Sequence, residues 1–349
     1  MTATVLQDLR ANYPSMLDKY ETRGTFYGLL DKAIQNTTDP RGIVSADVIS
    51  KALQSWGRQV DIPVMSPAAA ANGTGLTCTN TGTEAISNLV NVTWVTVSNG
   101  FEMQPAKNYQ NEIKYAQEFA RKYTDAIRAM ALAVDGAIYT QLNTVKAVAA
   151  DYGGGYVGAG NKYGALAGDA VQVALANYGD WFNDSIDIMA FSDIYPMFDV
   201  VMSTNGRSIY RNLFAQGQGN DTNTQYQFTN GELDFAFSNR VTLTAGSRAT
   251  GFIMPKGAFG IIGRNSPDCL AGNTTSAGHM FGTVYEPMLG MTLDTLEYSL
   301  CGSIAVESGN AADAAAVREH FQFAAHYAIV TPYDSVSTPV IRKFDMLNA

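Results

Sequence analysis

Residues 105–150 read PAKNYQNEIKYAQEFARKYTDAIRAMALAVDGAIYTQLNTVKAVAA, and this stretch predicts one long amphipathic helix. Its apolar side chains recur in steps of three and four residues, which places them on one face of a helix. Pro105 suits the first turn, where its missing N–H needs no partner. At 1.5 Å per residue the helix would be roughly 65–70 Å long, several times the average for globular domains. The core positions expected on its apolar face are Ile113, Phe119, Ile127, Met130, Val134 and Ile138.

The segment before this helix, residues 59–104, has little charge and reads as an extended β loop. No lysine occurs between Lys51 and Lys107. Val90 to Trp94 alternates as a strand does, and the alternation shifts at Val95, which indicates a bulge or two buried faces. Such a loop is suited to lying on a neighbouring chain, although a hairpin packed on its own domain is the alternative. The residues expected to contact a neighbouring chain are Val64, Leu76, Val92, Trp94, Val97 and Phe101.

Composition limits the class of protein. The chain has 349 residues, is 46% hydrophobic and carries a net charge of −9. It has enough apolar residues to bury a core, and its negative charge argues against a groove that neutralises nucleic-acid phosphates. The charge does not argue against a protein that merely encloses nucleic acid.

Cysteines and targeting signals give the expected compartment. Cys78, Cys269 and Cys301 are odd in number and far apart, which fits neither a disulfide framework nor a zinc site and suits a reducing cytoplasm. The N-terminus has no basic-then-apolar signal sequence, and no run approaches the ~18 apolar residues of a membrane span.

The remainder of the chain mixes helices and strands without a repeat or an alternating βαβ pattern, so the class is α+β. A Gly-rich link follows the long helix at residues 152–160. The strands expected after it are 186–190, 252–255, 260–263, 293–300 and 321–330, and the helices are 192–202 and 311–319.

A search for catalytic patterns finds none that is specific. The G-x-G-x-x-G match at 153–158 follows a helix rather than a strand, so it reads as a linker. His320 and His326 fall on one face of a strand, without the other ligands that a metal needs. The carboxylate pairs at 184/187 and 193/199 read better as solvated loop residues than as acid–base pairs. The sequence therefore predicts a protein that is not an enzyme and holds no cofactor.

The order of parts resembles the major capsid protein of tailed bacteriophages, which has the Hong Kong 97-like (Johnson) fold. Residues 107–148 resemble the spine helix of that family, and 321–330 resemble a late strand. Residues 187–210, which contain Asn205-Gly206-Arg207, resemble its strand–helix segment. The domains that the resemblance implies are an N-terminal arm (1–58), an extended β loop (59–104), a peripheral domain with the spine helix (105–180), part of an axial domain (181–240), a β-rich peripheral and axial region (241–305) and a C-terminal return to both (306–349).

The resemblance implies a structural protein that self-assembles as pentamers and hexamers into an icosahedral shell around double-stranded DNA. It implies no sequence-specific DNA binding and no membrane. Its further partners would be scaffold, portal and decoration proteins, and its location would be the virion, after assembly in the host cytoplasm. Two alternatives stay open: an encapsulin-like nanocompartment shell, which shares the fold, and a surface-layer or tail structural protein, which would not need a forty-residue helix.

Some members of this family lock their shells by an isopeptide bond from a lysine on the extended loop. The loop lacks a lysine here, so the expected shell is held by non-covalent contacts alone.

Overall fold

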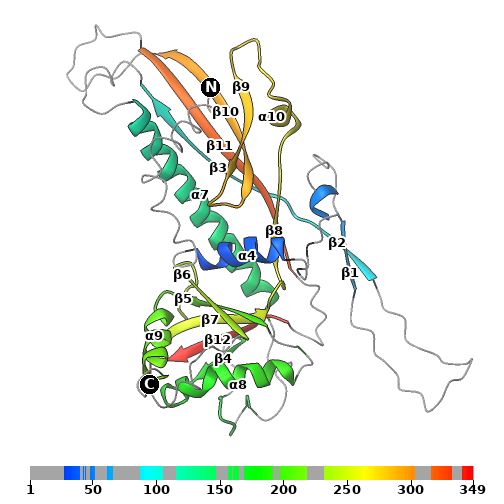
Figure 1. The fold of residues 1–349 in the computed structure, drawn as a ribbon, viewed down its shortest axis with the longest axis vertical. Coiled ribbons are helices and arrows are strands. Elements are labelled where there is room, and N and C mark those ends of the chain that lie inside the picture. The colour runs from blue at the N-terminus through cyan, green and yellow to red at the C-terminus, as the bar shows by residue number, and fades with distance from the viewer. Residues whose placement is uncertain are drawn as a thin grey trace, which may run out of the picture.

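The computed structural model is an elongated molecule with two lobes that one long helix joins (Figure 1). It describes residues 27–39, 42, 44, 48–51, 61–65, 87–104, 115–146, 156–158, 160–164, 169–191, 194, 197–217, 232–302, 316–331 and 340–348. Leu76, Ile113, Asp193, most of the Gly-rich link and the N-terminal arm up to residue 26 lie outside these ranges.

Helix α7 (Tyr115–Val145) is the long helix that the sequence predicts. Its 31 residues span roughly 46 Å. The predicted continuations at 105–114 and 147–150 lie outside the described residues. One face of α7 is buried from Phe119 to Leu142, and this face includes Ile127, Met130, Val134 and Ile138.

The upper lobe in Figure 1 is an antiparallel sheet packed on the N-terminal half of α7. Strand order is β3–β11–β10–β9, and β8 also pairs with β11. Phe101 and Phe321 of the sheet lie with ring centroids 5.3 and 5.0 Å from that of Phe119 on α7. The elements of this lobe are β3 (Val95–Met103), β8 (Gly260–Arg264), α10 (Pro267–Ala271), β9 (Met280–Glu286), β10 (Met291–Gly302) and β11 (Ala316–Val330).

The lower lobe is a five-stranded mixed sheet in the order β4–β12–β7–β5–β6. Four strands run in one direction and β7 runs in the other, because β12 is parallel to β4, β5 is parallel to β6, and β7 is antiparallel to both of its neighbours. Its elements are β4 (Ala170–Val173), the 3-10 turn η3 (Leu175–Asn177), α8 (Tyr178–Ala190), β5 (Phe198–Ser203), α9 (Gly206–Gly217), β6 (Leu233–Ser238), β7 (Ser247–Pro255) and β12 (Arg342–Leu347).

Both faces of this five-stranded sheet are covered. Val200 and Met202 of β5 lie in one core with residues of α8, whereas Val201 lies in the core of α7. Tyr139 near the C-terminal end of α7 contacts Phe252 of β7, with ring centroids 6.0 Å apart. Helix α7 therefore packs on the sheets of both lobes and fixes one relative to the other.

A two-stranded ribbon projects from the side of the molecule in Figure 1. Its strands β1 (Asp61–Met65) and β2 (Ser87–Asn91) are antiparallel, with Ile62 opposite Val90. Residues 92–94 separate β2 from β3, so the shift in alternation that the sequence shows marks the break between two strands.

Several predictions of secondary structure are confirmed and three are wrong. The strands expected at 252–255, 260–263, 293–300 and 321–330 lie within β7, β8, β10 and β11. The strand expected at 186–190 is instead the end of helix α8. The helix expected at 192–202 is wrong because residues 198–202 form β5, and the helix expected at 311–319 is wrong at 316–319, which begin β11. One βαβ unit, β5–α9–β6, is also present where no such pattern was expected.

Candidate functional site

Helix α4 (Gly28–Thr38) lies between the two lobes, at the waist of the molecule in Figure 1. It contacts α7, β5 and β6, and also β8 of the upper lobe. Its apolar residues Leu29, Leu30 and Ala33 are fully buried in the core of α7. This short helix is therefore the joint at which elements of both lobes meet.

A buried carboxylate of α7 holds the start of α4. The Oδ1 atom of Asp135 accepts a hydrogen bond from the backbone N–H of Leu30 at 2.9 Å, and Oδ2 accepts one from the Ser238 hydroxyl. The residue before α4, Tyr27, gives the helix no side-chain cap. A carboxylate at a helix N-terminus satisfies free N–H groups and complements the helix dipole. Asp135 therefore takes the role of a cap from a distant part of the chain.

The environment of Asp135 favours its protonated form more than water does. Burial raises the pKa of this carboxyl to about 6, and the hydrogen bonds from Ser238 and from the backbone of α4 offset only part of the effect. The charge of Asp135 therefore changes not far below neutral pH.

A buried ion pair holds the middle of α4 on the lower lobe. The Nζ atom of Lys32 lies 3.3 Å from Oδ1 of Asp199 and also contacts Asp234. The Nδ2 group of Asn36 donates to Oδ2 of Asp199 at 3.1 Å. Burial raises the pKa of Asp199, and Lys32 opposes this increase. The expectation of a solvated loop carboxylate is wrong here, because Asp199 lies inside strand β5 with no exposed surface.

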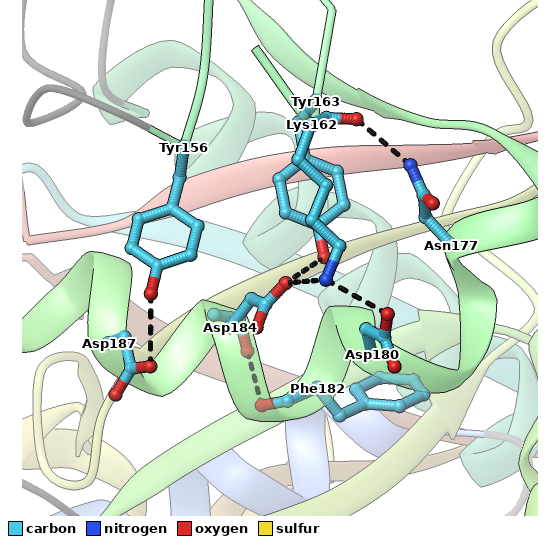
Figure 2. Close-up of polar contacts among 9 residues, drawn as sticks. Tyr156, Lys162, Tyr163, Asn177, Asp180, Phe182, Asp184 and Asp187 are labelled. Carbon is cyan, nitrogen blue, oxygen red and sulfur yellow. Dashed lines mark hydrogen bonds and ion pairs between the residues drawn. The ribbon is translucent and has the colours of Figure 1, made fainter.

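A second polar cluster fastens the end of the Gly-rich link to α8 (Figure 2). Lys162 bridges Asp180 and Asp184, with Nζ–Oδ2 distances of 2.9 and 2.6 Å. Tyr163 donates its hydroxyl hydrogen to Asp184 at 2.7 Å, and Tyr156 donates to Asp187 at 3.3 Å. The carboxylates belong to a helix and hold the loop, so the expectation that the 184/187 pair lies in a solvated loop is wrong.

The pKa directions in this cluster agree with a structural role. Burial and the hydrogen bond to Asp184 raise the pKa of Tyr163, so that its hydroxyl stays a proton donor. The hydrogen bonds to Asp184 and Asp180 raise the pKa of Lys162, so that its charge is kept. Exposed ion pairs of this kind add little stability, and their effect is to set the path of the chain.

The two histidines of β11 lie on the face of the upper sheet that is turned away from α7. The ring of His320 stacks on Tyr298, with centroids 4.8 Å apart. His326 lies 3.3 Å from Asp294 through Nε2 and 2.7 Å from the Thr96 hydroxyl through Nδ1. Burial tends to raise the pKa of Asp294, but the hydrogen bonds that it accepts outweigh burial and lower it. Each histidine thus has its own partners on the sheet.

In the described part of the chain, no three histidine, cysteine, aspartate or glutamate residues are grouped so that they could hold a metal ion. None of the described helices is long and apolar enough to cross a membrane.

Most of the residues expected to contact a neighbour have contacts within their own chain. Val92 is buried, and the Arg264 guanidinium lies 4.1 Å from the ring centre of the half-buried Trp94. Val97 and Phe101 pack against the core of α7. The side chain of Val64 and the whole of Leu76 are outside the part of the chain that the structure describes. Four of the six side chains therefore pack within the subunit, and a contact with a neighbour stays a prediction.

Large apolar side chains are exposed on both lobes. Phe191 follows α8 and Met197 precedes β5 in the lower lobe, and they are 66% and 50% exposed. The upper lobe exposes others on its strands and on α10. Single exposed apolar side chains are normal on protein surfaces, and a contiguous patch of them would be needed to indicate an interface. The exposed residues of the upper lobe are Val95, Leu270, Met280, Tyr285, Leu300 and Val317.

Comparison with known proteins gives no relative by sequence but several by structure. No family model and no curated protein matches the chain. The structure titled as the capsid asymmetric unit of cyanophage Pam1 matches with a TM-score of 0.50 at 10% identity, over 90% of this chain and 93% of that one. The capsid of Ralstonia phage GP4 matches with a TM-score of 0.48 at 9% identity, over 83% of each chain.

The Pam1 match, which covers 90% of this chain, carries the assignment. The mixed helix-and-sheet architecture described above agrees with it. The chain therefore has the α+β fold of phage major capsid proteins, the Hong Kong 97-like or Johnson fold.

Proposed function

We propose that this chain is a major capsid protein, which self-assembles through pentamers and hexamers into an icosahedral shell around double-stranded DNA. The observation that carries the proposal is the similarity to the Pam1 capsid subunit over nine-tenths of both chains. The shape of the chain suits a thin shell, because it has a long helix, two lobes in line and a ribbon projecting from one side (Figure 1).

The two cores support a division into peripheral and axial domains. We assign α7 and the sheet β3–β11–β10–β9 to the peripheral domain, and the five-stranded sheet with α8 and α9 to the axial domain. In this division β4 and all of α8 belong to the axial domain, so its first boundary lies before residue 170 rather than at 180.

The surface of the subunit is consistent with repeated protein contacts. Exposed apolar side chains occur on both lobes, and the ribbon β1–β2 is hydrogen-bonded to no other described strand. Burial of apolar area contributes about 25 cal/mol per Å² before ordering costs, and this contribution is repeated at every copy of a contact. We expect the ribbon to lie over a neighbouring subunit and to provide part of this area.

Electron microscopy of the expressed protein in negative stain tests the proposal. Closed shells, free capsomers or aberrant shells are the expected particles, since a subunit without a scaffold protein does not always close correctly. Light scattering over a range of salt and protein concentrations provides a second measurement. A compact monomer of 37.5 kDa under all of these conditions would contradict the proposal.

The content of the particles separates a capsid from an encapsulin-like compartment. Particles purified from infected or prophage-carrying cells should yield double-stranded DNA after nuclease treatment and extraction. Protein cargo without DNA would instead support the nanocompartment, which is expected to have the same fold. The same purification shows whether scaffold, portal or decoration proteins accompany the chain.

A further inference from the structure

Three adjacent strands of the lower lobe, β12, β7 and β5, each have one end at the same edge of their sheet. Strands β5 and β12 finish there and β7 begins there, as the pairing of Met202 with Gly251 and of Leu347 with Ser247 requires. Helix α9 starts directly after β5 at this edge, close to the C-terminal end of the described chain (Figure 1). In open sheets with parallel strands, ligands bind outside the carboxyl ends of the strands, next to the helix that follows.

A cavity of about 510 Å³ lies at this edge. It is lined from all three strand ends, and each lining residue that the structure describes is polar. None of these described residues is acidic, although the chain as a whole carries a net charge of −9. The lining residues are Thr204, Asn205 and Ser208 from the start of α9, Ser247 and Arg248 from the start of β7, and Asn348 after β12.

The start of α9 adds N–H groups to this cavity. The amides of Arg207 and Ser208 donate to the turn carbonyls of Thr204 and Asn205 through long hydrogen bonds, at 3.2 and 3.4 Å, against about 2.9–3.0 Å for a usual bond. The first turn of the helix holds no acidic side chain that would compete for an anion. The positive end of the helix dipole therefore faces the cavity without compensation from its own first turn.

Ser247 is a second and independent indication of a ligand. Only 6% of this residue is exposed, and its Oγ atom has no hydrogen-bond partner among the residues that the structure describes. It belongs to the wall of the cavity, and a buried hydroxyl without a partner costs free energy. The Oγ atom itself is almost fully covered by its neighbours, so a bound group becomes its partner through a small shift of the cavity wall.

The position of Ser247 is set by a tight turn. The N–H of Ser247 donates to the carbonyl of Thr244 at 3.0 Å, and Gly246 has a φ of 84°, which a side chain would disfavour. The carbonyl of Gly246 accepts a hydrogen bond from the backbone N–H of Asn348 at 3.1 Å. This turn therefore places Ser247, Arg248 and Asn348 together at the end of the sheet.

From this arrangement we propose that the cavity at the start of α9 binds a phosphate-type oxyanion. Arg248 supplies the charge, the start of α9 supplies N–H donors, and the hydroxyl and amide side chains surround the remaining oxygens. The chemistry is the same for inorganic phosphate and for a phosphodiester of nucleic acid. The proposal goes beyond shell assembly and does not depend on it.

Calorimetric titration of the full chain with inorganic phosphate tests the proposal. We expect binding with a dissociation constant of about 1 mM or tighter, weakened about tenfold in Arg248→Ala because a charge-assisted hydrogen bond is lost. The matched control is Arg128→Ala, which removes an exposed arginine from α7 and should leave the titration unchanged. A wild-type protein that binds neither inorganic phosphate nor a short DNA duplex would overturn the proposal, and so would an Arg248→Ala variant that binds phosphate as the wild type does.

Two further arms sharpen the test. Ser247→Ala should weaken phosphate binding without lowering the melting temperature in phosphate-free buffer, because the hydroxyl that it removes has no partner to lose. A lower melting temperature with unchanged phosphate affinity would show that Ser247 stabilises the fold and does not contact the bound anion. A short DNA duplex then identifies the source: duplex binding that Arg248→Ala weakens assigns the phosphate to nucleic acid, and binding of inorganic phosphate alone assigns it to the free ion.

Discussion

At the residue scale, Asp135 makes the joint between α7 and α4 sensitive to pH. Its folded-state pKa of about 6 lies above the value of a solvated aspartate, so the folded state holds the proton more tightly than the unfolded state. The resulting stabilisation is fully present below the unfolded pKa and is lost as pH rises through 6. Between pH 5 and pH 7.5 the loss is on the order of 1 kcal/mol.

Asp135→Asn should remove this pH dependence, because the amide has a similar shape and does not titrate. Chemical denaturation of both proteins at pH 5 and pH 7.5 measures it. The unfolding free energy of the variant relative to that of the wild type should increase by about 1 kcal/mol from pH 5 to pH 7.5. This expectation holds whatever the stability of the variant is at either pH. An equal pH response of the two proteins would mean that Asp135 titrates normally.

The ion pair of Lys32 and Asp199 behaves differently, because its two charges depend on each other. Lys32→Met leaves the carboxylate of Asp199 buried without its cation, which should cost roughly 3–5 kcal/mol of unfolding free energy. The double variant Lys32→Met/Asp199→Asn should recover most of that loss. Urea denaturation of the wild type, Lys32→Met, Asp199→Asn and the double variant measures the coupling, and a double variant with the sum of the two single losses would exclude it.

At the element scale, α7 is the element on which both lobes depend. Ile127→Asp or Val134→Asp places an unpaired charge on its buried face, which costs several kcal/mol. We expect neither variant to give soluble folded protein. Ala129→Asp lies on the exposed face of the same helix and is the matched control, which should fold. Circular dichroism and soluble yield compare the three, and normal folding of both buried variants would mean that this face of the helix is not needed for the core.

The periodicity of each element explains whether the sequence could predict it. The length and amphipathic period of α7 gave an unambiguous pattern, whereas residues 186–190 alternate over too short a window. In the whole of α8 the buried residues Trp181, Ser185, Ile188 and Met189 recur in steps of three and four, which is a helical period. Strand β5 has no period to read, because all six of its residues are buried.

The joint at α4 was not predictable in the same way. Asn36 and Asp199 are 163 positions apart, and no local pattern pairs them. The only local signal is Asp135, a charged residue within the apolar stripe between Ala131 and Ile138. Such a residue indicates a buried polar partner without saying where in the chain the partner lies.

At the scale of the whole molecule, the absence of lysine between Lys51 and Lys107 predicts a shell without covalent links through this loop. Particles boiled in denaturant and reducing agent should run on a gel as one band near 37.5 kDa. Shell stability should then depend on apolar burial, so dilute denaturant should release subunits. A ladder of covalent oligomers on the gel would show that a different residue supplies the link.

The sheet of the lower lobe also has a consequence for the order of events during synthesis. Strand β12, the last element along the chain, lies between β4 and β7, and β4 has no other partner among the described strands. Residues 170–173 therefore cannot pair with β12 until more than 160 later residues have been synthesised. Pairing over such separations is slow, because the entropy of closing a long loop is lost before any stabilising contact forms. A nascent subunit consequently lacks a finished lower lobe until residues 342–347 have been translated, which delays its competence for assembly until nearly the whole described chain exists.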